Sequence, residues 1–364
     1  MRSWEVYVSM AKILIKNGRV WDGEHFLYAD LFTDGDKISK IEPHISENAD
    51  FIYDADGKTV SAGLVDAHAH LRVHHTDQFG IQAEMSSFPF GVTAVADAGR
   101  SRGERAILDS FAVKNVVFAN VHIRNNVPDL EELAQTVVRF GDKTVGVKVY
   151  FDTEVSEVTD ISPLTAVCGF AREHGLRVMV HCSNAPTPMA DILHALSAGD
   201  ILTHAFHGGK SSAAEDCFES MKQAQSRGVI IDSGFAGHVH TDFGVLKKAI
   251  HCGIVPDTLS TDITKFSAYK RGGRYGMTMC MNIAQTMGMR EEDIFRAVTS
   301  NSSKALGMES EWGYLKIGRC ADIAVLDYTN EGFDLTDRAG NHISNTQGWR
   351  CVLTVSNGEV LYKD

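Results

Sequence analysis

The chain has 364 residues and a formal net charge of −12, with 44% hydrophobic and 23% charged residues. This length suffices for one barrel of about 250 residues and a smaller module. The composition is that of a globular protein, which excludes a disordered chain, collagen and a coiled coil. The acidic charge argues against a nucleic-acid partner. No stretch reaches about 18 uninterrupted apolar residues, so we expect no membrane span.

Cysteine usage and the N-terminus bear on the cellular compartment. The seven cysteines form no CxxC pair, and their number is odd, which matches neither a disulfide framework nor a zinc finger. Residues 1–18 lack the apolar core of a secretory signal. We therefore expect a cytoplasmic protein in a reducing compartment. We expect its partner to be a small-molecule substrate. Homo-oligomerisation stays open.

The two ends of the chain predict β structure. Residues 1–61 contain short strand-like runs and the turn signal Asn17-Gly18, and residues 309–364 contain similar runs and the turn Asn357-Gly358. Two separated segments of this kind can pair. We expect them to form one small β-sandwich domain.

Residues 62–308 differ because apolar strand runs alternate with helical patterns. The predicted strands are residues 63–70, 91–97, 116–122, 144–150, 176–182, 200–204, 229–233 and 258–262. Eight such units predict an α/β fold, a (β/α)8 TIM barrel. A doubly wound sheet is the alternative, but no GxGxxG or P-loop favours a nucleotide site there.

Polar residues occur at or near the carboxyl ends of five predicted strands, where the active site of a barrel lies. They are His68, His70, Lys148, His181, His204 and Asp262. His68 and His70 are two apart on a strand, so both face one side and suit a divalent metal. A lone histidine such as His181 or His204 is more often a hydrogen-bonded core residue. Because the chain also contains the pair of His68 and His70, we interpret His181 and His204 as further ligands.

Lys148 and Asp262 each allow more than one interpretation. Lys148 lies in an apolar strand, where an unpaired ammonium is costly to bury. A lysine carboxylated by CO2 becomes an anionic carbamate that can bridge two metals. A buried salt bridge and a Schiff-base lysine are the alternatives. Asp262 can bind metal and accept a proton from metal-bound water, or it can cap the next segment.

The chain resembles the amidohydrolase superfamily nearly from end to end, and three segments carry the resemblance. They are residues 63–70 (GLVDAHAH), 301–307 (NSSKALG) and 315–325 (LKIGRCADIAV). With a lysine on the fourth strand, the chain resembles the binuclear branch, which includes dihydroorotases, hydantoinases and deacetylases. The resemblance implies a carboxylated Lys148 bridging two divalent ions, usually zinc. One ion would be held by His68, His70 and Asp262, and the other by His181 and His204.

The reaction depends on the subgroup. Residues 91–99 (GVTAVADAG) are similar to the second strand of a deacetylase-like subgroup, and residues 232–238 loosely match its seventh-strand loop. Dihydroorotases and hydantoinases usually carry Ala-Pro after the last aspartate, whereas here Asp262 precedes Ile263-Thr264. We therefore expect a deacetylase that cleaves the amide or ester acyl bond of an N-acyl or O-acyl carboxylic acid. A cyclic-amide hydrolase is the alternative.

Two further classes are less favoured. Mononuclear deaminases of this superfamily lack the lysine and usually carry a glutamate after strand five, where this chain has residues 182–184 (CSN). Non-catalytic scaffolds lose metal ligands, and here all six candidates are present.

In the expected reaction, a metal-bridging hydroxide attacks the acyl carbonyl, and Asp262 is the general base. Arg72 shares the strand parity of His68 and His70 and resembles the dihydroorotase arginine that holds a substrate carboxylate. An ion pair with a local acid is its alternative role. The other candidates for lining the pocket are Asn184, His207, His238 and His240, and for the histidines a plain loop position is the alternative.

Overall fold

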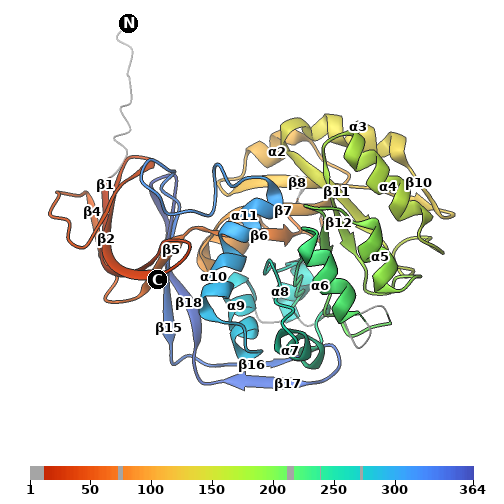
Figure 1. Cartoon of the computed structure of the whole chain (residues 1–364). Helices are drawn as coiled ribbons and strands as arrows, with labels where there is room; N and C mark the ends of the chain where they lie inside the picture. Colours follow the sequence, from red (N-terminus) through yellow and green to blue (C-terminus); the bar gives the residue numbers. More distant parts are fainter. Residues whose placement is uncertain (1–11, 73–76, 211–216, 238, 271–273) are drawn as a thin grey trace, which may run out of the picture.

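The computed structural model describes residues 12–72, 77–210, 217–237, 239–270 and 274–364. Its centre is a parallel sheet of seven strands that curls into a barrel (Figure 1). In spatial order the strands are β6 (Leu64–Ala69), β7 (Val92–Arg100), β8 (Lys114–Asn120), β11 (Thr144–Tyr150), β12 (Arg177–His181), β13 (Ile201–Thr203) and β14 (Ile230–Ile231). Most of their residues are buried, as expected for a parallel sheet covered by helices.

Residues 258–263 join the two edges of this sheet in place of a regular eighth strand. Thr258 forms a parallel bridge with Asp232 beside β14, and Ile263 forms one with Ala69 of β6. The Asp262 amide also donates to the His68 carbonyl at 2.7 Å. The predicted α/β barrel fold is therefore confirmed, with its last strand reduced to isolated bridges.

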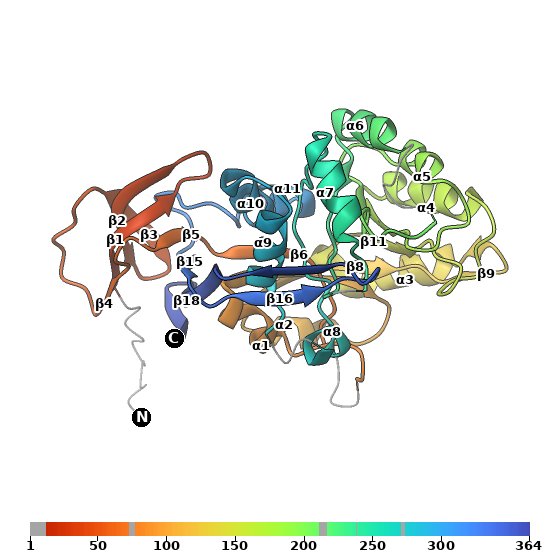
Figure 2. The same ribbon diagram turned by 90° about the horizontal axis from the view of Figure 1, so that it is seen from below.

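Helices cover the outside of the barrel (Figures 1 and 2). The longer ones are α3 (Leu130–Phe140), α4 (Ser162–Glu173), α5 (Met189–Ala195), α6 (Phe218–Ser226), α7 (Phe243–His251), α9 (Met277–Thr286), α10 (Glu291–Val298) and α11 (Ser300–Leu306). Shorter pieces are α1 (Ala83–Ser87), α2 (Arg105–Asp109), α8 (Lys265–Lys270), the 3-10 turns Phe88–Phe90 and Gly141–Lys143, and a β9 (Ile123–Arg124) and β10 (Val127–Pro128) hairpin. Within the described residues, no helix is long and apolar enough to cross a membrane.

The two chain ends pair into one mixed sheet of eight strands. The sequence predicted that these two segments would pair with each other. Its order is β19 (Glu359–Lys363), β18 (Gly348–Ser356), β15 (Ile323–Thr329), β5 (Thr59–Ala62), β1 (Lys12–Trp21), β2 (Phe26–Asp34) and β3 (Lys37–Glu42), with β4 (Phe51–Asp54) beside β1. The antiparallel β5–β15 pair joins the two ends. The sheet encloses its own apolar cluster, which includes Ile13, Leu31, Val60, Ile323 and Leu353.

One part of the C-terminal segment leaves this sheet and lies along the barrel (Figure 2). It is the hairpin of β16 (Phe333–Thr336) and β17 (His342–Asn345). In its turn, Asp337 accepts a hydrogen bond from the amide of Phe243, the first residue of α7, at 2.7 Å. The hairpin therefore reaches the end of the barrel that carries the loop before α7.

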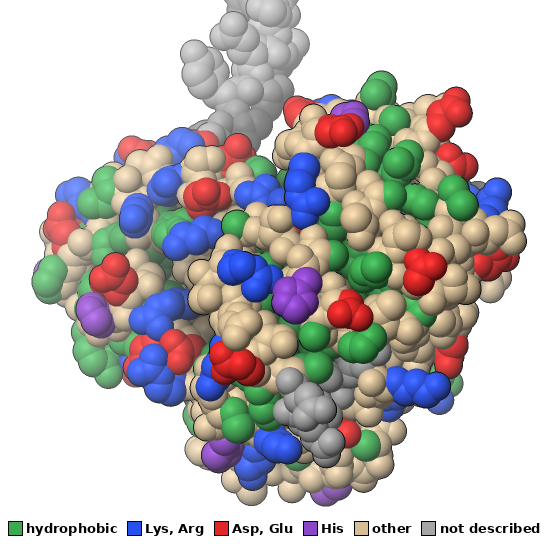
Figure 3. Space-filling model, turned by 45° about the vertical axis from the view of Figure 1, so that its right-hand side comes forward, with side chains coloured by type: hydrophobic (Ala, Val, Ile, Leu, Met, Phe, Trp, Pro, Cys, Tyr) green, Lys and Arg blue, Asp and Glu red, His purple; other side chains and the backbone are tan. Residues whose placement is uncertain are grey.

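The surface agrees with the acidic but mixed composition. On the face in Figure 3, acidic and basic side chains are interspersed, and no broad basic area gathers over any element. This face offers no electrostatic footprint for a polyanion.

Candidate metal centre

The carboxyl ends of the barrel strands bring the six predicted ligands together. His68 and Lys148 lie within β6 and β11, His181 ends β12, His70 and His204 follow β6 and β13, and Asp262 lies in the closing segment, residues 258–263. All six side chains are buried. All except Lys148 line one cavity with a volume of about 770 Å³. Five of the polar residues predicted at the strand ends therefore meet at this cavity.

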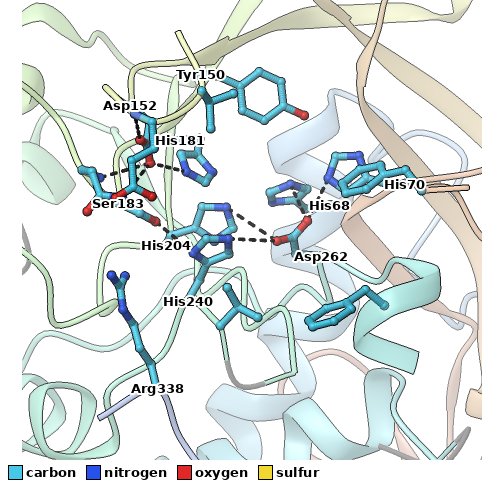
Figure 4. A pocket seen from close by; sticks show the side chains of 16 residues that line it. His68, His70, Tyr150, Asp152, His181, Ser183, His204, His240, Asp262 and Arg338 are labelled. Carbon is cyan, nitrogen blue, oxygen red and sulfur yellow. Dashed lines mark hydrogen bonds and ion pairs between the residues drawn. The ribbon is translucent and has the colours of Figure 1, made fainter. Parts of the chain in front are cut away.

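Asp262 lies at the centre of the first cluster (Figure 4). Its Oδ1 is 2.8 Å from His70 Nε2 and 3.3 Å from His68 Nε2. Its Oδ2 is 3.8 Å from His204 Nε2. The donor atoms of His68, His204 and Asp262 lie within 4.8 Å of one another, a spacing that can hold a metal ion.

A second cluster adjoins the first and contains a histidine that the sequence analysis gave no metal role. His181, His204 and His240 bring donor atoms within 4.8 Å of one another. His240 Nε2 is also 4.0 Å from Asp262 Oδ2. His240 comes seven residues after the predicted seventh strand, so its position in the sequence does not mark it as a strand-end residue.

Four of the histidine rings are each fixed through one nitrogen by a hydrogen bond. The pairs are His68 Nδ1 with Thr203 Oγ1 (3.0 Å), His204 Nδ1 with the Gly234 carbonyl (2.7 Å), His181 Nε2 with Asp152 Oδ2 (3.0 Å), and His240 Nδ1 with Ser183 Oγ (2.9 Å). Metal-binding histidines are normally held this way, because the outer bond sets the tautomer and orients the ring. The other nitrogen of the His181, His204 and His240 rings remains for the cavity, whereas that of His68 lies 3.1 Å from Lys148 Nζ.

His204 provides a direct test of whether a cation fits. Its Nε2 is buried and has no hydrogen-bond partner within the described residues. Leaving such an atom unsatisfied costs about 1–3 kcal/mol. Imidazole nitrogens and a carboxylate form a donor set that suits zinc and similar divalent ions. The residues present therefore fit a divalent metal.

The electrostatics of the cavity keep the histidines in the form that binds metal. Burial lowers the pKa of His68 to about 4 and that of His240 to about 3, and it lowers the pKa of His204 well below its usual value. These rings are neutral at pH 7, as metal ligation requires. Burial would raise the pKa of Asp262, but its interactions with His68 and His70 lower it below its ordinary value.

Lys148 lies beneath the cavity, fully buried, with its Nζ 3.1 Å from His68 Nε2. Burial lowers the pKa of the Lys148 amine to about 8. Within the described residues, this amine forms no ion pair with a carboxylate, and its side-chain partner is His68. The salt-bridge interpretation of Lys148 therefore finds no support among these residues.

The other predicted pocket residues fall in different places. Asn184 lines the cavity, with its Nδ2 3.3 Å from Asp152 Oδ2. His207 is buried, accepts a hydrogen bond from the Gly209 amide, and is not among the described residues that line the cavity. Arg72 is half-buried and is likewise not among them. His238 lies outside the described residues.

The cavity also contains residues that no sequence pattern indicated. Phe79, Val155, Val239 and Phe266 give it apolar walls, and Tyr150, Asp152, Glu154, Ser183 and Arg338 give it polar ones. Asp152 lies two residues beyond β11, where nothing in its spacing marks it as the partner of His181. Arg338 comes from the β16–β17 turn, which the sequence assigned to the terminal domain.

Comparisons with known proteins agree with this architecture. Residues 59–361 match the model of the amidohydrolase family. A deacetylase of Enterococcus faecalis is 26% identical over 96% of this chain and 98% of its own length. A deacetylase of Agrobacterium fabrum is 26% identical over 86% and 81% of the two chains. Among solved structures, a dihydroorotase is similar in fold, with a TM-score of 0.84 and 23% identity over 97% of this chain and 98% of that one.

Proposed function

Because the chain belongs to the amidohydrolase family, we propose that it is a metal-dependent deacetylase. Its substrate would be an N-acyl or O-acyl carboxylic acid, of which it hydrolyses the amide or ester acyl bond. The observation that carries the proposal is the set of four rings, each fixed through one nitrogen, around the carboxylate of Asp262. The similarity to two deacetylases over most of the chain supports hydrolysis of an acyl group.

The proposed cofactors are two divalent ions, zinc by the nature of the donors. His68, His70 and Asp262 would hold one ion and His181 and His204 the other, with His240 a further donor beside the second. A carboxylated Lys148 would complete both sites, and its full burial without an acidic partner among the described residues supports this. When bound, such ions lower the pKa of water to about 7 and polarise a carbonyl.

The residues of the chain have separate tasks in this reaction. The histidines position the ions, and their own orientation depends on Thr203, Gly234, Asp152 and Ser183. Asp262 accepts the proton of the attacking water and delivers it to the leaving nitrogen or oxygen. Its lowered pKa keeps it ionised at neutral pH, and the ionised carboxylate is the form that accepts a proton.

A substrate panel with zinc-loaded protein tests the proposal. We expect release of acetate from N-acetyl amino acids or O-acetyl hydroxy acids, and two metal equivalents per chain. Hydrolysis of cyclic amides alone would instead identify the alternative, a dihydroorotase-like or hydantoinase-like enzyme. Release of ammonia from aminopurines with one metal equivalent would identify a deaminase and contradict the proposal.

A further inference from the structure

Arg338 enters the cavity of the candidate metal centre from a part of the chain that is remote in sequence. It lies in the turn between β16 and β17 and lines the cavity together with the candidate ligands. Figure 4 shows its side chain extending into the cavity on the side of Ser183 and His204. Arg338 and the candidate ligands therefore line the same cavity.

The turn that carries Arg338 is fixed to the barrel by hydrogen bonds. Asp337 is buried and accepts from the Phe243 amide at 2.7 Å and from Asn341 Nδ2 at 2.9 Å. The Arg338 amide donates to the Thr241 carbonyl at 3.2 Å. Thr241 follows His240, so the turn is held next to the second histidine cluster. The backbone therefore positions the guanidinium, although the side chain itself is solvent-exposed.

The charge of Arg338 is not neutralised by the protein. Among the described residues that line the cavity, Arg338 is the one lysine or arginine. Its side chain forms no ion pair with any acid in the described part of the chain, although Glu154 lines the same cavity. In a chain with a net charge of −12, a positive side chain of this kind offers an anion a local attraction that the whole molecule does not.

We propose that Arg338 is the specificity-determining residue that binds the carboxylate of the substrate. A guanidinium binds a carboxylate through two parallel hydrogen bonds. The acyl carbonyl would then lie at the metal centre, and Phe79, Val155, Val239 and Phe266 would contact an apolar side group. This inference rests on the proposed function, and it assigns to Arg338 the role that the sequence analysis predicted for Arg72.

Ligand binding tests the inference without turnover. The probes are both enantiomers of N-acetylphenylalanine and of its neutral carboxamide, titrated calorimetrically into the zinc-loaded Asp262→Asn variant. We expect the carboxylate to bind more tightly than the amide. Adding Arg338→Met should weaken carboxylate binding by about 10- to 100-fold and leave amide binding unchanged. Arg338→Lys should retain part of the preference. Arg124→Met, which removes an exposed arginine outside the cavity, is the matched control.

The outcomes separate this inference from the proposed function. Equal binding of acid and amide by the parent protein would overturn it, as would an equal loss of both in Arg338→Met. Loss of carboxylate preference in Arg72→Met, with none in Arg338→Met, would return the role to Arg72. If the wild-type protein binds the carboxylate through Arg338 but releases no acetate, the proposed deacetylase activity fails and the inference about Arg338 stands.

Discussion

His204 Nδ1 donates to the carbonyl of Gly234 at 2.7 Å, and both residues have a left-handed backbone, with φ of 62° and 49°. This contact aims the ring of His204 at the cavity, where its Nε2 is a candidate donor in both histidine clusters. A side chain at position 234 would collide with Thr203 Oγ1 and with the His204 ring. Gly234, in the loop after β14, therefore controls the orientation of His204, a predicted ligand that follows the neighbouring strand β13.

Gly234→Ala tests this control. We expect it to lower the free energy of unfolding by about 2–4 kcal/mol, because a positive φ costs about 1–2 kcal/mol and the collision adds to it. The bound metal should fall by at least one equivalent per chain. Urea unfolding of the metal-free protein and elemental analysis of the loaded protein measure the two effects.

The matched control for Gly234→Ala is Gly175→Ala. Gly175 has a similar φ of 65°, and a Cβ there meets no atom within 4 Å. This variant should lose only the backbone contribution, about 1–2 kcal/mol, and keep its metal. If both variants lost equal stability and both kept their metal, the contact between Gly234 and His204 would have no special role.

Asp262→Asn separates the two roles assigned to Asp262. The amide keeps the shape of the side chain and an oxygen for a metal, but it is a far poorer proton acceptor than a carboxylate. We expect turnover of an acylated acid to fall by about 100- to 10,000-fold, with metal content retained. Asp334→Asn, at a largely exposed position, is the control and should keep full activity. Near-normal turnover in Asp262→Asn would exclude Asp262 as the general base.

Lys148→Ala addresses the proposed carbamate. Because this variant cannot form the carbamate, we expect it to lose about one of the two metal equivalents and its turnover to fall by at least about 100-fold. A small carboxylate such as propionate, added at high concentration, should restore part of both, because it can occupy the space of the carbamate. Lys148→Arg should be inactive and not restored, because its side chain fills that space and carries no carboxylate. Full metal content and activity in either variant would contradict the carbamate.

The sequence predicted the part of the structure that depends on local pattern. Apolar runs and turn signals located the strands, and the carboxyl ends of parallel strands necessarily meet at one edge, so His68, His181 and His204 were found from position alone. The end of the chain was predicted to pair with its beginning, and β5 and β15 do so.

The parts that were missed depend on contacts between distant segments. Arg338 reaches the cavity only because the turn that carries it docks on the start of α7 through Asp337. No periodicity or spacing in residues 309–364 encodes that docking. His240 was predicted as a pocket residue, and it lines the cavity. Its place in a metal cluster was not predicted, because it depends on the contact between the loop after β14 and His181, which only the folded chain shows.

The depressed pKa values of the histidines predict how the metal-free protein responds to acid. His68 and His240 have folded-state pKa values of about 4 and about 3, whereas in the unfolded chain both return to about 6.5. Between pH 6.5 and pH 4 the unfolded chain therefore binds more protons than the folded one, so the free energy of unfolding decreases as the pH falls through this window. Above about pH 7.5 the two rings contribute almost no pH dependence, because they are then neutral in both the folded and the unfolded chain.

Urea unfolding of the chelator-treated protein at pH 7.5 and pH 5.5 measures this effect. Each of the two rings should account for about 1 kcal/mol of the fall in unfolding free energy between these values. His240→Asn removes one of the titrating groups, so its fall should be smaller than that of the wild type by about that amount. Because the carboxylates elsewhere in the chain are the same in both proteins, they cancel in the comparison. Equal falls in both proteins would show that His240 is not held neutral by burial, and the cavity would then lack the electrostatics that metal binding needs.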